Sequence, residues 1–163
     1  IMIAAREGRA IRFNESTVRP MGRVSSGVRA ISIDDDNEVI GMIAIEPDSE
    51  EDVLVISENG YGKRTPVEDY RIINRGGQGV KNYEVTEKTG KIVGIKVVDG
   101  SEDLLLVTES GVMIRTAVDS VRATGRATQG VIVMRFKEEG DRVIAMALTE
   151  KEEAEGEDEN KGE

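Results

Sequence analysis

The sequence contains neither cysteine nor histidine. The lack of cysteine excludes a disulfide framework and zinc sites built on thiolates. The lack of histidine excludes imidazole metal sites and any catalytic triad or general base that depends on histidine. A chain without cysteine is also compatible with a reducing cytoplasm.

Long apolar runs and aromatic side chains are scarce as well. No stretch approaches the roughly 20 apolar residues that a membrane helix requires, and Ile1–Ala5 lacks the length and the basic flank of a signal peptide. Aromatic residues make up only 3% of the chain, so a core has to be built from Val, Ile, Leu and Met. The 163 residues suffice for one ordinary domain. The chain starts in the middle of a recurring pattern, which predicts that it is part of a longer protein.

The net charge of −10 is unevenly distributed. The segment Glu150–Glu163 holds eight acidic residues and two lysines and so accounts for −6 of it. Elsewhere the acids gather in turns such as Asp34–Asp36, whereas the arginines gather in other loops. The body of the chain can therefore present a basic stripe although it is acidic overall. Residues 149–163 are predicted to form a disordered acidic tail.

One pattern occurs three times along the chain. Gly27, Gly79 and Gly130 occupy its equivalent positions at spacings of 52 and 51 residues, and Gly8, Gly60 and Gly111 keep the same spacings. A period near 50 is typical of supersecondary units that bury their apolar faces against their neighbours. We therefore divide the chain into blade-like repeats over residues 1–52, 53–103 and 104–148, followed by the tail over residues 149–163.

Each repeat is predicted to begin with a β-hairpin and a connector. In the second repeat, Val53–Ser57 runs into Asn59-Gly60, the strongest two-residue hairpin signal, and Tyr61–Thr65 returns as the partner strand. The connector that follows, Pro66–Gly79, contains at most one turn of helix.

A second hairpin is predicted to complete each repeat, from Val80–Thr86 and Lys91–Val98 in the second repeat. The strands expected in the other repeats are Ile1–Ala5, Arg9–Phe13, Val28–Ile33, Glu38–Ile45, Leu104–Thr108, Val112–Thr116, Val131–Lys137 and Arg142–Leu148. Four strands per repeat favour an all-β, propeller-like fold, a partial ring of about three four-stranded antiparallel blades.

Cationic side chains recur at equivalent positions of the repeats. These positions are Arg12, Arg64 and Arg115; Arg19, Arg71 and Arg122; Arg23, Arg75 and Arg126; and Arg29 and Lys81, with Lys63 as an addition in the second repeat. Arginine binds phosphate oxygens bidentately, and such contacts supply affinity without sequence choice. The scarcity of aromatics argues against base stacking on single strands. The repeats are therefore predicted to align these side chains into a rim that binds the duplex backbone.

Glycines lie beside one of these arginines. Gly76, Gly77 and Gly79 follow Arg75 and could bring backbone N–H groups close to an anion. The stretch lacks the Lys-Ser/Thr ending of a phosphate-binding P-loop. We include the three glycines in the predicted phosphate-binding surface.

Other roles for these residues remain open on the sequence alone. Each arginine could instead cap a strand carbonyl or pair with an acid of its own chain, an interpretation that suits Arg12, Arg64 and Arg115 best because they lie in predicted strands. The repeats could equally form a protein-interaction module. Catalysis has no support, since Asp34–Glu38 lacks the pattern of an EF-hand loop and the three tyrosines lack activating neighbours. No catalytic or metal-binding residue is predicted.

The connector motifs resemble those of a known family. Arg19–Ala30, Asn74–Gly79 and Gly125–Val131 resemble loops in the C-terminal domain of the A subunit of bacterial DNA gyrase, a DNA-wrapping β-pinwheel of a type II topoisomerase. The resemblance covers about residues 1–148, and the acidic tail fits it too. The family's hallmark box reads Gln-Arg-Arg-Gly-Gly-Lys/Arg-Gly. The nearest match, Ile73–Gly79, keeps one arginine and three glycines and differs at its first, second and sixth positions.

The resemblance implies a fold and a function. It implies a disc of about six blades that exchange strands with their neighbours, of which this chain would supply the C-terminal half, with the hallmark box upstream. It implies non-sequence-specific binding and wrapping of duplex DNA in support of ATP-dependent supercoiling. ATP and magnesium would belong to other parts of the holoenzyme, and this chain would carry no cofactor and no catalytic tyrosine. The equivalent domain of topoisomerase IV is the alternative.

The resemblance also implies partners and a set of binding residues. The expected partners are duplex DNA, the remainder of the A subunit of DNA gyrase, and the B subunit of the same enzyme, in the cytoplasm and away from membranes. An open arc of three blades leaves unpaired strand edges, which predicts self-association. The predicted nucleic-acid-binding residues are Arg19, Arg23, Arg29, Lys63, Arg64, Arg71, Arg75, Gly76, Gly77, Gly79, Lys81, Arg115, Arg122 and Arg126.

Overall fold

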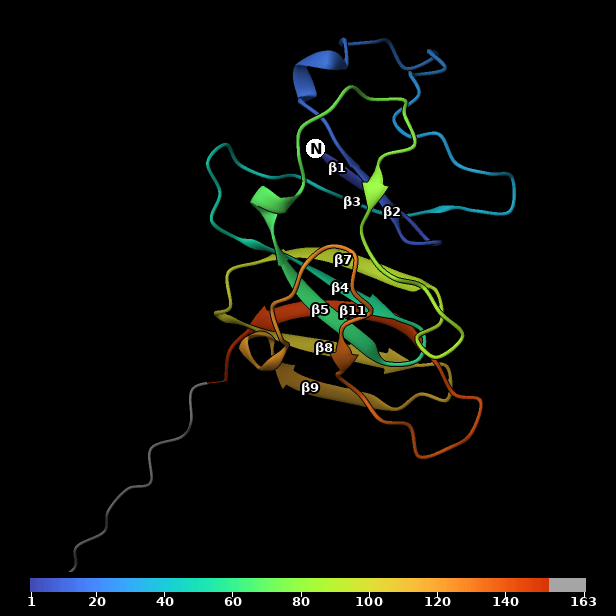
Figure 1. Ribbon diagram of the computed structural model, residues 1–163, viewed down its shortest axis with the longest axis vertical. Coiled ribbons are helices and arrows are strands. Elements are labelled where there is room, and N and C mark those ends of the chain that lie inside the picture. Colours follow the sequence, from blue (N-terminus) through green and yellow to red (C-terminus); the bar gives the residue numbers. More distant parts are fainter. Residues whose placement is uncertain (153–163) are drawn as a thin grey trace, which may run out of the picture.

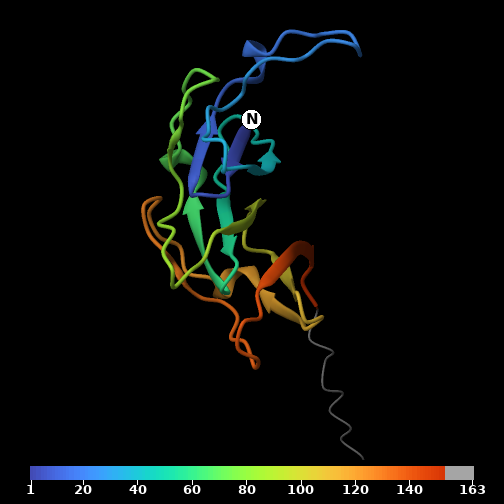
Figure 2. The ribbon, with the colours of Figure 1, turned by 90° about the vertical axis from the view of Figure 1, so that its right-hand side faces the viewer.

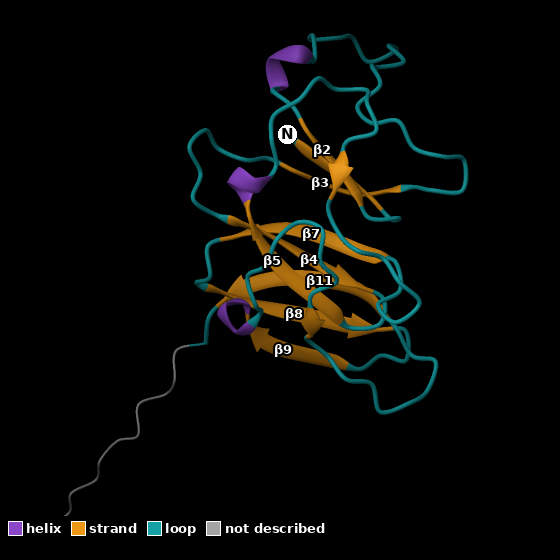
Figure 3. Ribbon diagram, viewed as in Figure 1, coloured by secondary structure: helices purple, strands orange, loops and turns teal. Residues whose placement is uncertain are grey.

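The computed structural model describes residues 1–152, and β-strands make up nearly all of their regular structure (Figure 3). The strands are β1 (Met2–Ala5), β2 (Arg9–Arg12), β3 (Val39–Ile43), β4 (Asp52–Ser57), β5 (Tyr61–Pro66), β6 (Val80–Lys81), β7 (Ile92–Val98), β8 (Glu102–Thr108), β9 (Met113–Ala117), β10 (Val131–Ile132) and β11 (Val143–Glu150). Single turns of 3-10 helix follow β2, β5 and β9 and are η1 (Glu15–Thr17), η2 (Val67–Asp69) and η3 (Val118–Ser120). Within residues 1–152, no helix is long and apolar enough to cross a membrane.

Three antiparallel sheets follow one another along the long axis of the molecule (Figure 1). Their strand orders are β3-β1-β2-β6, β10-β5-β4-β7 and β11-β8-β9. This arrangement confirms the predicted all-β, propeller-like fold with three blades in a row. The described part of the third blade has three strands rather than four, because nothing pairs with the outer edge of β9.

Neighbouring repeats exchange strands. β6 leaves the second repeat to pair with β2 of the first, with Val80 opposite Ala10, and β10 leaves the third repeat to pair with β5, with Val131 opposite Gly62. The long connectors carry these segments across the boundary, as the family resemblance implied. The predicted repeat boundaries stay predictions, because each exchanged strand belongs to one repeat by sequence and to another by pairing.

The predicted second hairpins are wrong. β7 pairs with β4 and β11 pairs with β8, so neither forms a hairpin with the exchanged strand that precedes it. The exchanged strands are only two residues long, since the chain then turns and donates the N–H groups of Asn82 and Tyr83 to the carbonyl of Gly8. The apolar alternation beyond Lys81 therefore fills the space between blades instead of extending a ladder.

The strand predicted over Val28–Ile33 is also missing. Its equivalents, β6 and β10, exist only because they lie against a strand of another repeat. No strand of the described residues lies beside residues 28–33, whose backbone hydrogen bonds to Gly76 and Gly77 join them to a loop and form no ladder. The prediction was wrong because pairing depends on the neighbour rather than on local propensity.

Close backbone contact at two glycines fixes the exchange. Gly79 has φ +74°, and a Cβ placed on it would lie 2.2 Å from the carbonyl oxygen of Ala10. Gly130 has φ +75° and the same 2.2 Å separation from the carbonyl oxygen of Gly62. Only glycine fits such a contact with positive φ. The 51-residue spacing of these glycines therefore records a repeated docking geometry.

The hydrophobic cores are shared between neighbouring blades. In β4, Val53 and Val55 belong to the cluster against the first repeat, whereas Leu54 and Ile56 belong to the cluster against the third. Successive side chains of a strand point to opposite faces, so β4 is covered on both faces and these four side chains are fully buried. Burial between blades is therefore what holds the row together.

The last strand runs further than predicted. β11 extends to Glu150, with Thr149 opposite Asp103, so the first two residues of the predicted disordered tail are strand residues. The ladder with β8 continues because Asp103 and Glu102 offer backbone partners there. Residues 153–163 of the predicted tail lie outside the described part of the chain.

Candidate nucleic-acid interface

The connectors of the second and third repeats run along the same side of the row of blades. Residues 66–79 and 117–130 form the green and orange loops at the left edge of Figure 2, after η2 and η3. The connector of the first repeat, in blue, extends away from the blades at the top of that view. The structure therefore brings two of the three predicted cationic loops to one side.

The strand arginines Arg12 and Arg64 hold the repeats together. Arg12 donates from Nη1 to the carbonyl oxygens of Val67 and Tyr70, both at 3.1 Å. Arg64 donates from Nε to the carbonyl oxygen of Val121 at 2.8 Å and pairs with Asp52 at 3.2 Å. Each guanidinium thus fastens the short helix of the next repeat. These contacts agree with the interpretation that the strand arginines cap carbonyls and pair with acids of their own chain. The assignment of Arg64 to the DNA surface is corrected accordingly.

Arg115, the third member of that series, is also occupied within the chain. Its Nε lies 2.8 Å from a carboxylate oxygen of Asp103, and its Nη1 lies 3.0 Å from Glu152. Its Nη2 donates to the carbonyl oxygen of Glu150 at 2.8 Å. Two carboxylates offset the charge of this guanidinium within the chain, and the assignment of Arg115 to the DNA-binding set stays a prediction.

Lys63 was assigned to the DNA surface, and the structure corrects this. The residue is fully buried, and its ammonium donates to the carbonyl oxygens of Gly125, at 2.9 Å, and Arg126. It lies 5.4 Å from the ring centroid of Tyr83. Burial, reinforced by the charge of Arg126, lowers the pKa of Lys63 to about 7. A buried ammonium cannot reach a phosphate.

The sequence did contain a signal for this interior position. The equivalent residues in the other repeats are Ile11, which is fully buried, and Ile114, which is half-buried. A lysine at a position that is otherwise apolar has its charge solvated by backbone carbonyls rather than by water. Lys63 therefore belongs to the junction between the second and third blades.

Arg75 and Arg126 are positioned at the surface without losing their charge. Arg75 donates to the carbonyl oxygens of Thr17 and Arg29, each at 3.0 Å. Arg126 donates from Nη1 to the carbonyl oxygen of Lys81 at 2.7 Å. Carbonyl oxygens orient a guanidinium but do not neutralise it, and both side chains remain partly exposed. These arginines are held in place and keep a full positive charge.

The remaining predicted cations are exposed. No carboxylate of residues 1–152 lies within ion-pair distance of Arg19, Arg23, Arg29, Arg71 or Arg122. Lys81 is exposed but pairs with Glu84. Arg71 and Arg122 lie on the two neighbouring connectors, next to Arg75 and Arg126 in sequence, whereas Arg19 and Arg23 lie on the connector that extends away.

The glycines of the box-like stretch have mainly structural roles. The N–H of Gly76 donates to the carbonyl oxygen of Ala30 at 2.6 Å, and the carbonyl of Gly77 accepts from Ser32. Gly79 packs against Ala10 as described above. The N–H of Gly76 is therefore used within the chain, and the prediction that it faces an anion is corrected.

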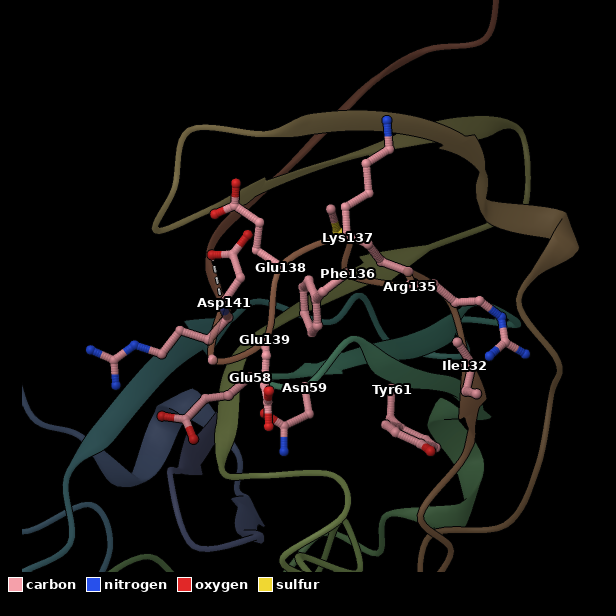
Figure 4. A pocket seen from close by; sticks show the side chains of 13 residues that line it. Glu58, Asn59, Tyr61, Ile132, Arg135, Phe136, Lys137, Glu138, Glu139 and Asp141 are labelled. Carbon is pink, nitrogen blue, oxygen red and sulfur yellow. Dashed lines mark hydrogen bonds between the residues drawn. The ribbon is translucent and has the colours of Figure 1, made fainter.

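A surface hollow elsewhere has mixed charge. It lies between the turn at residues 58–61 and the segment 132–142, and the rings of Tyr61 and Phe136 project into it (Figure 4). Arg135, Lys137 and Arg142 share its lining with Glu58, Glu138, Glu139 and Asp141. Charges of both signs do not favour a polyanion, so the connector side is the better candidate interface.

Comparison with known families assigns all three repeats to one family of domains. The family model described as the DNA gyrase C-terminal domain, beta-propeller, matches residues 1–46, 51–99 and 102–150. The DNA gyrase A subunit of Staphylococcus aureus strain MRSA252 is 44% identical over 160 residues, which are 98% of this chain and 18% of that protein. Its counterpart in strain NCTC 8325 is 45% identical over 157 residues, again 18% of its length. The chain thus spans about a fifth of these relatives.

Solved structures agree in fold. The C-terminal domain of a DNA topoisomerase IV superposes with a TM-score of 0.83 at 24% identity, over 91% of this chain and 46% of that one. A DNA gyrase A C-terminal domain superposes with a TM-score of 0.77 at 24% identity, over 90% and 49%. The ParC C-terminal domain of E. coli gives 0.68 at 19% identity, over 90% and 60%. At these identities the structures support the fold alone, and the sequence matches carry the family assignment.

Proposed function

Since the chain belongs to the DNA gyrase C-terminal domain family, we propose that it binds duplex DNA without sequence preference and bends it along the connector side of the blades. The observation that carries this proposal is the state of Arg75 and Arg126. Both guanidinium groups are oriented by neutral carbonyl oxygens, at 3.0 Å from Arg29 and 2.7 Å from Lys81 respectively, and neither has a carboxylate partner among the described residues.

The contrast with the strand arginines supports this assignment. Arg64 and Arg115 pair with Asp52 and Asp103, so their charges are satisfied inside the protein. Arg75 and Arg126 lie on loops, and no carboxylate of the described residues pairs with them, so their positive charge is available to a phosphate. Preorganised cations lose little side-chain entropy when they meet a phosphate, which favours binding. The exposed Arg71 and Arg122 on the same connectors add to this charge.

The proposed mechanism is geometric and electrostatic. The second and third repeats each present one connector along the same side of the row, so a duplex that touches both has to follow the surface between them. Bending 20–30 base pairs by 40–90° costs about 1–6 kcal/mol. Several phosphate contacts have to offset this cost, and each makes binding more sensitive to salt.

The larger context rests on the family. In the whole protein, the bent duplex would be delivered to the parts of the gyrase A and B subunits that cut and pass DNA in the cytoplasm. ATP hydrolysis and magnesium chemistry would reside in those parts. The sequence relatives at 44–45% identity are gyrase subunits, which favours gyrase over the topoisomerase IV domain.

A retardation titration tests the proposal. Linear duplexes of graded length are titrated with the protein at several salt concentrations. The logarithm of affinity is expected to fall linearly with the logarithm of salt concentration, with a slope of about −0.9 per phosphate contacted. Affinity is expected to rise with duplex length until the connectors are covered. A duplex affinity that does not change with salt concentration, or no duplex binding at all, would instead support a protein-interaction module.

A further inference from the structure

The second and third connectors are attached to the preceding repeat by similar backbone bonds. In the third connector, Thr124 donates to the carbonyl oxygen of Arg64 at 2.8 Å. In the second, Ile73 donates to the carbonyl oxygen of Arg12 at 2.9 Å, one repeat earlier. The two connectors therefore leave the blades in the same way.

One backbone bond of the second connector is not repeated in the third. The N–H of Gly76 donates to the carbonyl oxygen of Ala30 at 2.6 Å. The equivalent residues of the third connector, Ala127 and Asn82, form no such bond in the described chain. The end of the third connector, residues 124–130, therefore depends on other groups for its position.

Two side chains of the second repeat supply those groups. The ammonium of Lys63 donates to the carbonyl oxygen of Gly125 at 2.9 Å and to that of Arg126. The hydroxyl of Tyr83 donates to the carbonyl oxygen of Gln129. The peptide groups on both sides of the Arg126 side chain are thus held by the second blade.

Neither donor has a polar counterpart in the preceding junction. The residue equivalent to Lys63 is Ile11, and the residue equivalent to Tyr83 is Ile31, and both isoleucines are buried. The first junction forms the same strand exchange with these apolar side chains, so the exchange itself needs no ammonium or hydroxyl. Burying such polar groups costs free energy unless they are hydrogen-bonded, and here every one of their bonds named above goes to the third connector.

The ammonium of Lys63 lies next to one other charge. Arg126 and the ring of Tyr83, with its centroid 5.4 Å away, face it, and no carboxylate of residues 1–152 lies within ion-pair distance of it. Burial and the charge of Arg126 lower the pKa of Lys63 to about 7. A phosphate bound beside Arg126 would favour the charged form of Lys63 and so raise this pKa.

We propose that Lys63 and Tyr83 are positioning residues of the DNA-binding surface, which hold the third connector so that Arg126 meets the duplex. This inference rests on the proposed function. The guanidinium of Arg126 is itself bonded to the carbonyl oxygen of Lys81 at 2.7 Å, so its backbone and its side chain are both fixed before DNA arrives. A loop that is ordered in advance loses less entropy on binding and therefore binds more tightly.

A pair of tyrosine substitutions in the full chain tests the role of Tyr83. Y83F removes the hydroxyl that bonds Gln129, and Y70F is the matched control, because the hydroxyl of Tyr70 bonds the side chain of Asn82 at 2.6 Å and not the third connector. Y83F is expected to lower duplex affinity about three- to tenfold and Y70F less than about twofold. Thermal unfolding measures the stability of both variants. Equal duplex affinities of Y83F and Y70F would overturn the role of Tyr83.

The pH profile of duplex affinity tests Lys63. Above pH 7 the free protein has a neutral Lys63, so binding takes up a proton, and wild-type affinity is expected to fall about three- to tenfold between pH 7 and pH 9 at constant salt. K63M is expected to lose this fall. Burial and Arg12 lower the pKa of the N-terminal amine from 8.0, but this group is present in both chains and cancels in the comparison. Identical pH profiles would overturn the role of Lys63.

Amide hydrogen exchange of residues 124–130 without DNA separates this inference from the proposed function. Exchange is expected to become about tenfold faster in K63M and Y83F and to stay within about twofold of wild type in Y70F. Unchanged exchange in K63M and Y83F would refute the positioning role, whether or not the protein binds DNA. Faster exchange in these variants, together with a wild-type chain that binds no duplex, would instead refute the proposed function and with it the role of both residues in DNA binding.

Discussion

Arg126 donates a hydrogen bond from Nη1 to the backbone oxygen of Lys81 at 2.7 Å, and this contact ties the third connector to the exchanged strand of the second repeat. The same bond joins Arg75 to Arg29 one repeat earlier, at 3.0 Å. Because each acceptor is an uncharged carbonyl, one side chain both fastens the blades and offers a positive charge to solvent. The fold and the candidate interface thus share these residues.

Substitution of connector arginines should lower DNA affinity, whereas substitution of a strand arginine should lower the stability of the fold. R71A/R122A removes two exposed guanidinium groups and is expected to lower duplex affinity about tenfold and the salt slope by about 2, with an unchanged melting temperature. R64A removes the bond to Val121 and the pair with Asp52 and is expected to cost about 2 kcal/mol of stability. Retardation assays and thermal unfolding of both variants check this. Equal DNA affinity of R71A/R122A and wild type would contradict it.

Gly79 should tolerate no side chain. G79A places a Cβ 2.2 Å from the carbonyl oxygen of Ala10 at φ +74° and is expected to destabilise the fold by about 2 kcal/mol or more. The matched control is G77A, because nothing lies within 4 Å of a Cβ there, and it is expected to stay within about 0.5 kcal/mol of wild type. Urea unfolding measures both. If the two variants proved equally stable, the close contact would not hold the exchange.

Lys63 should make stability depend on pH. Its pKa is lowered from 10.5 to about 7 by burial and the charge of Arg126, so between these values the unfolded chain binds a proton that the folded chain does not. Stability is therefore expected to rise from pH 7 to pH 9.5, by at most about 1.4 kcal/mol per pH unit, and to gain nothing from Lys63 below pH 7. Urea unfolding at four pH values checks this.

A K63M variant provides the comparison. Methionine has a similar length and cannot titrate, so the part of the slope due to Lys63 is expected to disappear. The window stops at pH 9.5, where Tyr83 stays protonated because burial raises its pKa to about 12. Identical slopes in K63M and wild type would show that Lys63 is not the source.

The acidic end of the chain should weaken DNA binding. Residues 153–163 carry six acidic residues and one lysine, and this charge opposes that of the connectors. Removing them is expected to raise duplex affinity severalfold at low salt, with the gain fading above about 0.3 M salt as charges are screened. A chain with glutamine in place of these acids should behave like the truncated one. An unchanged affinity in both variants would eliminate competition by this segment.

The architecture follows from the sequence alone. Spacings of 51 and 52 residues, the glycine positions and the strand patterns predict an all-β row of blades, and the family motifs in the connectors assign it to the gyrase C-terminal domain. These features can be recognised in the sequence because each repeat packs against its neighbour in the same way and has the same residue types at the contact positions. The first hairpin of every repeat follows from local turn signals, since its partner strand is only a few residues away.

The pairing of strands across repeats, and the set of arginines that keep their charge, depend on tertiary packing. Lys63 and Arg64 are adjacent cations that read as surface residues, yet one is buried among carbonyl oxygens and the other pairs with Asp52. Arg75 and Arg126 lie on the predicted connectors, but the sequence does not specify that they meet only neutral acceptors. The reason is physical: Asp52 lies on the strand paired with that of Arg64, but the other partners lie 45 to 63 residues away along the chain, and only the docking of neighbouring blades brings those groups together.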